Sequence, residues 1–223
     1  MTAAINRGEA RGRILDTAEE LFAENGVEAV SLRTINSAAG VSPGVLHYHF
    51  GSREVLVHEL INRHMQQLWA TRAEMLAPLM AEERPCLRSI MHSLVDPLAQ
   101  LALEKSTTDQ ELISPGARYV KFIARLYSDR SPALVEASEP YRETQKLYPQ
   151  LLRKALPELE PGVIDLKFAM ANHAMLQALV DLNSPGRSWL GSEQANMAKT
   201  GIVTILVDFL TGGMSPPPDE RTT

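Results

Sequence analysis

The side chains best suited to chemistry in this 223-residue chain are its histidines and its single cysteine, Cys86. No histidine belongs to an H-E-x-x-H zinc motif or follows a glutamate by three residues. The chain also lacks a G-x-S-x-G nucleophile elbow, a phosphate-binding loop and a G-x-G-x-x-G fingerprint. One cysteine allows neither an internal disulfide nor a cysteine zinc cluster. We therefore expect no enzyme activity, no cofactor and no metal site. The six histidines are His47, His49, His58, His64, His92 and His173.

Charge is distributed unevenly along the chain. The formal net charge is −5, which by itself argues mildly against a nucleic-acid partner. Residues 14–30 carry five acids and no base, whereas residues 31–53 carry Arg33 and Arg53 and no acid. An ordinary mixed surface would give similar counts, but the acidic total does not describe residues 31–53. Two bases predict few non-specific phosphate contacts, so any DNA binding would depend mainly on base contacts and dimer geometry.

Residues 31–50 have the layout of a helix-turn-helix. Ser31 is placed to cap a short helix, which Gly40 then interrupts. Ser42 and Pro43 open a second short helix, since proline at the first helical position needs no N–H. A helix of this kind is thin enough to enter the major groove of DNA. Many small helical hairpins also turn at a glycine, so the layout alone leaves a purely structural hairpin open.

Apolar residues recur every three to four positions, which indicates an all-α protein. Sustained apolar–polar alternation, the pattern of half-buried strands, is absent. In the first helix Ile14, Ala18 and Phe22 lie on one apolar stripe. The expected helices, about nine in all, cover residues 9–25, 32–39, 43–49, 52–81, 86–104 with a kink at Pro97, 115–127, 131–156 with a break near Pro140, 163–182 and 194–210.

Three stretches of the chain resemble the tetracycline-repressor (TetR) family of transcriptional regulators. They are Ile14-Leu-Asp-Thr-Ala-Glu-Glu-Leu-Phe-Ala-Glu-Asn-Gly, Ser31-Leu-Arg-Thr-Ile and Ala38-Ala-Gly-Val-Ser-Pro-Gly-Val-Leu-His-Tyr-His-Phe-Gly-Ser-Arg-Glu-Val-Leu. The resemblance covers residues 10 to 60, approximately, and is more specific than a generic helix-turn-helix. It implies an N-terminal three-helix DNA-binding domain followed by a larger helical domain, which binds a ligand and dimerises through its last two long helices.

With this resemblance, DNA-binding roles can be assigned residue by residue. Pro43 is expected to contact a thymine methyl group, and Gly44 to permit close approach to the bases. An N-terminal arm with Arg7, Arg11 and Arg13 is expected to add backbone or minor-groove contacts. The expected base-facing residues are Ser42, Pro43, Gly44 and His47, and the expected phosphate-binding residues are Arg33, Thr34, Tyr48, His49 and Arg53.

The chain departs from the usual TetR pattern at three positions within residues 31–53. The family usually has tyrosine where His47 stands and lysine where Arg53 stands, and often alanine where Asn36 stands. His47 can still donate or accept a hydrogen bond, so the departure bears on the preferred operator more than on binding itself. Arg53 keeps the positive charge. We expect Asn36 to face outward or to lie near the backbone.

The helices between residues 52 and 182 carry candidates for a ligand pocket. An apolar cavity with a few polar anchors suits a small organic molecule, and methionine adapts to varied shapes. Core packing explains any single one of these residues equally well, and the family resemblance is what favours a pocket. The candidate lining residues are Met65, Trp69, Arg72, His92, Arg118, Tyr119, Phe122, Met170 and His173.

The last two helices carry more apolar surface than one core needs. Two such helices from each protomer would form a four-helix interface around a two-fold axis. The alternative is that the last helix packs only within its own chain. The candidate interface residues are Phe168, Met175, Leu179, Ile202, Ile205, Leu206 and Phe209.

These patterns predict a helix-turn-helix domain over residues 1–51, a ligand-binding and dimerisation domain over 52–213 and a disordered tail over 214–223. The N-terminal residues lack the apolar region of a signal peptide, and the longest apolar stretch is too short to span a bilayer. We expect a cytoplasmic homodimer with no membrane partner.

The function expected is a ligand-responsive transcriptional repressor. It would bind a near-palindromic operator in double-stranded DNA and be released by a small apolar or amphiphilic organic effector. The resemblance leaves activator behaviour open. A helical small-molecule sensor or adaptor without DNA activity is the alternative from another functional class.

Overall fold

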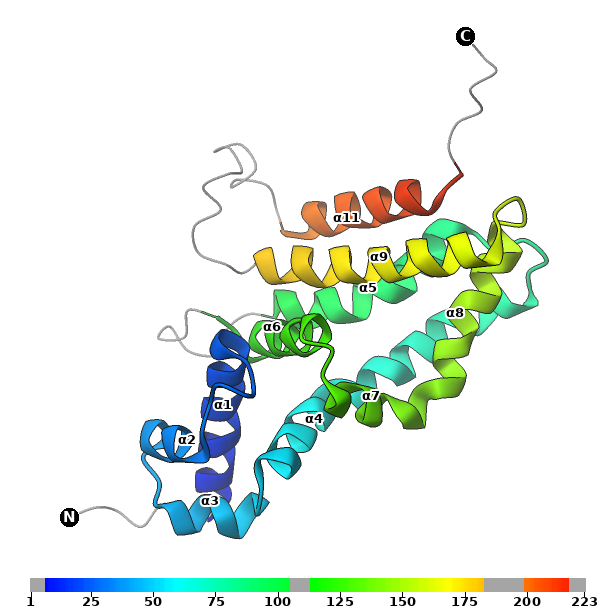
Figure 1. Cartoon of the computed structure of the whole chain (residues 1–223). Coiled ribbons are helices and arrows are strands. Elements are labelled where there is room, and N and C mark those ends of the chain that lie inside the picture. The colour runs from blue at the N-terminus through cyan, green and yellow to red at the C-terminus, as the bar shows by residue number, and fades with distance from the viewer. Residues whose placement is uncertain (1–6, 105–112, 183–198, 217–223) are drawn as a thin grey trace. The chain divides into compact units, whose positions relative to one another are not determined.

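The computed structural model describes residues 7–104, 113–182 and 199–216, and every regular element in these ranges is helical (Figure 1). The expectation of an all-α chain is confirmed. The chain forms two compact units. Unit 1 comprises residues 1–66 and 104–139, and unit 2 comprises residues 67–103 and 140–223. The chain passes from unit 1 to unit 2 within helix α4 (Arg53–Leu76).

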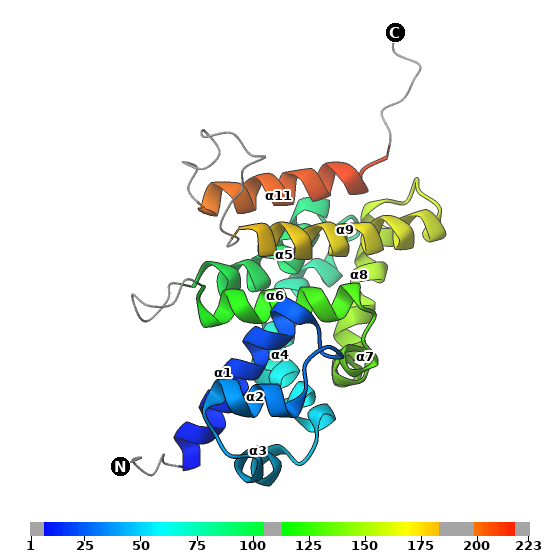
Figure 2. The ribbon, with the colours of Figure 1, turned by 60° about the vertical axis from the view of Figure 1, so that its left-hand side comes forward.

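Unit 1 is built around α1, which packs against α2, α3 and α6. In both views α3 lies near the N-terminal end of α1 and α6 near its C-terminal end (Figures 1 and 2). The unit also contains the first half of α4. Its other helices are α1 (Arg7–Asn25), α2 (Leu32–Ala39), α3 (Pro43–Phe50), α6 (Pro115–Ser128) and α7 (Pro132–Ser138).

The core of unit 1 follows from the apolar stripe of α1. Ile14, Ala18 and Phe22 are fully buried. The ring of Phe22 stacks on that of Phe122 in α6, with centroids 6.3 Å apart. Gly26 ends α1 because its φ of +84° cannot continue a right-handed helix, and its N–H donates to the carbonyl of Phe22.

In unit 2, α9 and α11 lie side by side, and α11 also packs on α5 (Figure 1). Pro97 lies inside α5 and is buried. The Nζ of Lys167 in α9 donates to the carbonyls of Gly213 (2.9 Å) and Ser215 (2.6 Å), which caps the C-terminal end of α11. The elements of this unit are the second half of α4, η1 (Pro78–Ala81), α5 (Leu87–Leu103), α8 (Arg142–Ala155), α9 (Pro161–Asp181) and α11 (Lys199–Met214), and η2 (Glu139–Tyr141) begins at the last residue of unit 1.

The end of α4 and the start of the C-terminal tail differ from the expected positions. The helix expected over 52–81 ends at Leu76, since Pro78 has no N–H to continue the helical hydrogen bonds, and residues 78–81 form the separate short helix η1. The expected tail begins too early, because Met214 lies in α11 and is buried. The predicted boundary between residues 51 and 52 stays a prediction, although the compact units meet inside α4 instead.

Some expected features lie outside the described residues. These are the side chain of Arg7, most of the expected loops over 105–114 and 183–192, the first residues of the expected last helix, 194–198, and most of the expected tail, 217–223. None of the helices in the described part of the chain has the length and hydropathy needed to span a bilayer.

Candidate nucleic-acid interface

The first helix of the helix-turn-helix, α2, starts at a serine cap. Ser31 has extended backbone, and its Oγ accepts a hydrogen bond from the N–H of Thr34 at 3.1 Å. This bond satisfies one of the N–H groups that lack a partner in the first helical turn. Ile35 is fully buried, which turns Arg33 and Thr34 outward into solvent. The structure thus exposes both residues expected near phosphates on this helix.

The turn between α2 and α3 requires glycine. Gly40 has φ +61° and ψ +37°, and its N–H donates to the carbonyls of Asn36 and Ser37 at the end of α2. A Cβ at this position would lie 2.9 Å from Nη2 of Arg13. That guanidinium donates to the carbonyl oxygen of Ala39. The left-handed backbone therefore favours glycine at this position, and a side chain here would have to displace the end of Arg13.

The second helix, α3, turns one face inward and one face to solvent. Leu46 and Phe50 are buried within unit 1. The Oγ of Ser42 forms no capping bond with the helix that it precedes. Tyr48 is 73% exposed, which is unusual for so large an aromatic ring. The exposed residues of this face are Ser42, Pro43, Gly44, His47 and Tyr48.

Two residues of α3 carry further information about this surface. His49 is only half-buried, and its ring lies edge-on to that of Tyr48 at 5.2 Å between centroids. A Cβ added to Gly44 would meet no atom within 4 Å. Packing within the chain therefore does not require glycine at this position.

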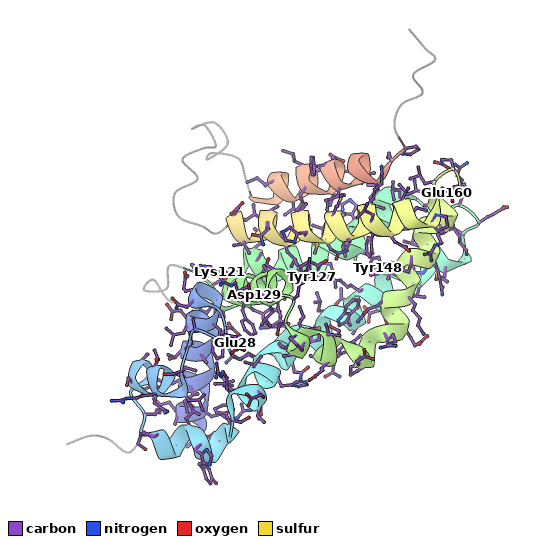
Figure 3. The ribbon with its side chains drawn as sticks, in the orientation of Figure 1. Glu28, Lys121, Tyr127, Asp129, Tyr148 and Glu160 are labelled. Atoms are coloured by element: carbon purple, nitrogen blue, oxygen red, sulfur yellow. The ribbon has the colours of Figure 1, made fainter. Side chains whose placement is uncertain are left out.

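The structure gives Arg53 a role within the protein. Its Nη1 donates to the carbonyl of Val27 at 3.1 Å and lies 3.6 Å from the carboxylate of Glu28. Glu28 lies in the connection between α1 and α2 (Figure 3). Arg53 therefore ties the start of α4 to this connection, and its expected phosphate contact stays a prediction.

The expectation of a free N-terminal arm conflicts with the positions of Arg11 and Arg13. Both lie within α1 and have partners inside unit 1. Arg11 forms an ion pair with Glu59 of α4. Of the two positions expected for Asn36, the outward one is wrong, because this side chain is buried, and the position near the backbone stays a prediction. Its Oδ1 has no hydrogen-bond partner in the part of the chain that the structure describes.

A buried carboxyl group that was not predicted from the sequence lies where α1 meets α4. Glu19 is 1% exposed, and its Oε2 accepts a hydrogen bond from Arg63 at 3.2 Å. Burial raises the pKa of Glu19 from 4.5 to about 7, against the lowering effect of Arg63 and Arg118. Asp16 pairs with the same Arg63 at 2.8 Å. The available signal was spacing, because Glu19 lies four residues after buried Leu15 and so falls on the inward stripe.

The candidate ligand residues divide between the two units. In unit 1, Tyr119 and Phe122 are fully buried. The Tyr119 hydroxyl donates to the carbonyl of Ile61 at 2.8 Å, and its ring lies 4.6 Å from that of His64. Burial lowers the pKa of His64. Met65 is also buried and Arg118 is partly buried. These contacts hold α6 on α1 and α4, so core packing accounts for Tyr119 and Phe122.

In unit 2, Trp69 and Arg72 form a compact aromatic and cationic group. The Arg72 guanidinium carbon lies 4.8 Å from the centre of the Trp69 ring, and its Nη2 donates to the carbonyl of Leu94 at 2.9 Å. Trp69 also stacks on Tyr141, with centroids 6.0 Å apart. His92, on α5, pairs with Asp96 at 3.0 Å.

The last two ligand candidates lie on the outer face of α9. Met170 is 61% exposed and His173 is also exposed. An exposed methionine does not line an interior cavity in this structure. The expectation that Met170 lines a ligand pocket is therefore not supported by its position.

The candidate dimer residues also occupy two different environments. Met175, Leu179 and Leu206 are buried inside unit 2, so they contribute to the core of their own chain. Phe168 is half-buried and stacks on buried Tyr148 at 5.3 Å (Figure 3), and Ile202 is half-buried. The large apolar side chains that α9 and α11 leave exposed are Val163, Leu166, Met170, Ile205 and Phe209.

The sequence matches two family models that agree with this architecture. Residues 14–60 match the bacterial regulatory proteins of the tetR family, and residues 109–213 match the tetracyclin repressor-like C-terminal domain. The chain belongs to the TetR family. Members are transcriptional regulators with a helix-turn-helix, and this chain is a DNA-binding transcriptional regulator of that kind. Residues 31–50 form the helix-turn-helix of this TetR chain.

Two curated TetR-type relatives illustrate the extent of the similarity. The chain is 30% identical to the HTH-type transcriptional repressor KstR2 of Rhodococcus jostii strain RHA1, over 71% of this chain and 67% of that protein. It is 43% identical to the HTH-type transcriptional regulator UidR of Escherichia coli strain K12, over 23% of this chain and 26% of that protein.

Solved structures confirm the fold of this TetR chain. The probable transcriptional regulatory protein RHA5900 has a TM-score of 0.60 at 19% identity, covering 93% of this chain and 100% of that one. At this identity the likeness shows the fold alone.

Within the described ranges, no group of three or more histidine, cysteine or acidic side chains is arranged to hold a metal ion.

Proposed function

We propose that this TetR protein is a ligand-responsive repressor that binds a near-palindromic DNA operator as a homodimer. The observation that carries the proposal is the outward face of α3, where Pro43, Gly44, His47 and Tyr48 are exposed while Leu46 and Phe50 hold the helix on unit 1. The name of KstR2, a transcriptional repressor similar to most of this chain, supports repression over activation.

The chemistry of the exposed face fits a DNA duplex. His47 can donate or accept toward a base edge, and the Pro43 ring can contact a thymine methyl group. The backbone at Gly44 can approach a base closely, because nothing within the protein occupies the space of a Cβ there. Arg33 and Thr34, exposed at the start of α2, are placed for phosphate contacts. Residues 31–50 carry no acidic side chain that would repel the phosphates.

The exposed apolar side chains of α9 and α11 support the homodimer. Leu166, Met170, Ile205 and Phe209 are each more than half exposed. Large apolar side chains gathered on adjacent helices are typical of a protein interface. A homodimer carries two copies of α3, and dimers with two such helices read half-sites in successive major grooves, about 34 to 36 Å apart.

The Trp69 and Arg72 group in unit 2 supports an amphiphilic organic effector. An aromatic surface beside a buried cation can bind the apolar and the polar part of one molecule. The effector would release DNA only as far as it binds the DNA-free state more tightly than the DNA-bound state.

A gel-shift assay on the DNA upstream of the protein's own gene tests the DNA-binding part of the proposal. We expect retardation that survives excess unrelated DNA and weakens markedly as salt rises from about 50 mM to about 200 mM. Folded, dimeric protein that retards no fragment would instead support the sensor or adaptor.

The ligand part of the proposal needs a separate measurement. A thermal-shift screen of apolar and amphiphilic organic molecules should yield compounds that raise the melting temperature and also release bound DNA. Compounds that stabilise the protein without changing its DNA affinity would contradict ligand-controlled release.

A further inference from the structure

The C-terminal end of α2 is capped by an arginine from another helix. Nη2 of Arg13, in α1, donates a hydrogen bond to the carbonyl oxygen of Ala39, the last residue of α2. The last carbonyls of a helix have no partner within the helix, and they carry the negative end of its dipole. A cationic donor is therefore well suited to this position.

The bond from Arg13 complements the backbone bonds of the turn. The N–H groups of Gly40 and Val41 already donate to Asn36, the latter at 3.0 Å. Arg13 supplies the donor for Ala39, and its guanidinium fills the space beside Gly40. The turn from which α3 departs is thus held both by its own backbone and by α1.

A second arginine of α1 acts at the opposite end of α3. Arg11 places its guanidinium carbon 5.4 Å from the centre of the ring of Phe50, the last residue of α3. The same side chain forms an ion pair with Glu59 of α4. Arg13 therefore contacts the end of α2 from which the turn to α3 departs, and Arg11 contacts the C-terminal end of α3.

We propose that Arg13 is a positioning residue for DNA recognition, which orients α3 through the C-terminal end of α2 and does not itself bind phosphate. Arg11 supports the other end of α3 in the same way. This inference rests on the proposed DNA-binding function. It replaces the backbone or minor-groove contacts that the sequence suggested for both arginines.

The two roles predict different dependence on salt. A side chain that binds a phosphate releases a counterion from the DNA. Its removal therefore weakens binding to every sequence, and it also makes the logarithm of affinity fall less steeply with the logarithm of salt concentration, a dependence called the salt slope below. A side chain that only orients α3 affects the base contacts, which carry sequence information. Loss of Arg13 should therefore reduce the preference for the operator and leave the salt slope unchanged.

Fluorescence anisotropy on two duplexes separates these roles. One duplex is enriched from a random-sequence pool by the wild-type protein, and the other is an unrelated sequence of equal length. We expect Arg13→Ala to lose about tenfold in affinity for the enriched duplex, comparable with one lost base-pair contact. Its affinity for the unrelated duplex and its salt slope should match those of the wild type. The control, Arg33→Ala, removes an exposed arginine of α2 and should weaken binding to both duplexes and lower the slope by about one.

Arg13→Gln tests the hydrogen bond separately from the charge. Glutamine carries no charge and has an amide donor, but its side chain is two atoms shorter, so it can form only a weakened bond to the Ala39 carbonyl. We expect its affinity for the enriched duplex to lie between those of the wild type and Arg13→Ala, with an unchanged salt slope. Circular dichroism and gel filtration at the assay temperature establish that each variant is folded and associated as the wild type is. If Arg13→Ala is not folded, Arg13→Gln decides alone.

Two results would overturn the inference while DNA binding itself stands. One is a fall of about one in the salt slope of Arg13→Ala or Arg13→Gln, with equal losses on both duplexes, because this is the behaviour of a phosphate contact. The other is an unchanged preference for the enriched duplex in folded Arg13→Ala. A wild-type protein that enriches no duplex would instead overturn the proposed function on which the inference rests.

Discussion

Individual residues of unit 1 show where sequence patterns were informative and where they were not. The requirement for glycine at position 40 was readable, since it stands between two short helical patterns. The hydrogen bond of Arg13 beside this glycine was not, because its partner Ala39 lies 26 residues later and no local pattern links the two. Buried Glu19 was missed for a different reason. Acids are rarely buried, so its position on the apolar stripe was outweighed by its charge.

Glu19 should make the stability of the protein depend on pH near neutrality. Its carboxyl has a pKa of about 7 in the folded protein, against the ordinary value of 4.5 that it keeps in the unfolded chain. Between these values the folded protein binds a proton that the unfolded chain has lost. The stabilisation is complete below pH 4.5 and is lost as the pH rises through 7, by about 3 kcal/mol.

Urea unfolding of the wild type and Glu19→Gln between pH 5 and 8 measures this effect. The wild type should lose stability relative to Glu19→Gln as the pH rises, because the amide cannot ionise. The control is Glu20→Gln, which changes an exposed neighbour on α1 and should follow the wild type. A constant difference between wild type and Glu19→Gln across this range would show that Glu19 does not titrate there.

At the scale of helices, local capping signals predicted most boundaries. Ser31, Pro43 and Pro115 each stand at or just before the first residue of a helix, as expected from their backbone preferences. The docking of α6 on α1 was not predictable from such signals. It brings Lys121 to Glu24, 97 residues away in the sequence (Figure 3), and nothing in the pattern of either helix names its partner.

Tyr119→Phe tests the docking of α6. The change removes the hydroxyl that donates to the carbonyl of Ile61 in α4 and leaves the buried ring in place. We expect a loss of about 1 kcal/mol in the free energy of unfolding. Chemical denaturation at a fixed protein concentration measures it. Tyr48→Phe, which alters a largely exposed tyrosine, should leave stability unchanged. Equal stability of the two variants would show that the Tyr119 bond contributes nothing.

For the whole molecule, the sequence predicted which helices expose large apolar side chains better than it predicted which of their residues do so. The helices now observed as α9 and α11 were expected to supply the dimer interface, but Met175, Leu179 and Leu206 face the interior of unit 2. Both helices are apolar on more than one side, so periodicity alone could not distinguish the core face from the outer face. The exposed fractions make that distinction and leave Ile205 and Phe209 as interface candidates.

Phe209→Asp should dissociate the proposed dimer. Phe209 is 67% exposed, and a carboxylate in its place would have to be desolvated when two copies associate. We expect dimerisation to weaken by at least about 2 kcal/mol, as for a central interface residue. Sedimentation velocity should then show monomer at concentrations where the wild type is dimeric.

The matched control for this prediction is Val135→Asp, which places the same charge on α7, where Val135 is 62% exposed. This variant should sediment as the wild type does. If Phe209→Asp also remains dimeric, the interface lies elsewhere on the molecule.

The central claim is that two copies of α3, held on one dimer, read DNA. Selection of duplexes from a random-sequence pool by the purified protein, followed by sequencing, tests it most directly. We expect an enriched inverted repeat whose half-sites are centred about 10 to 10.5 base pairs apart, which is one helical turn, or a multiple of this spacing. A pool that stays random after selection, or one enriched in a single asymmetric site without a repeat, would contradict it.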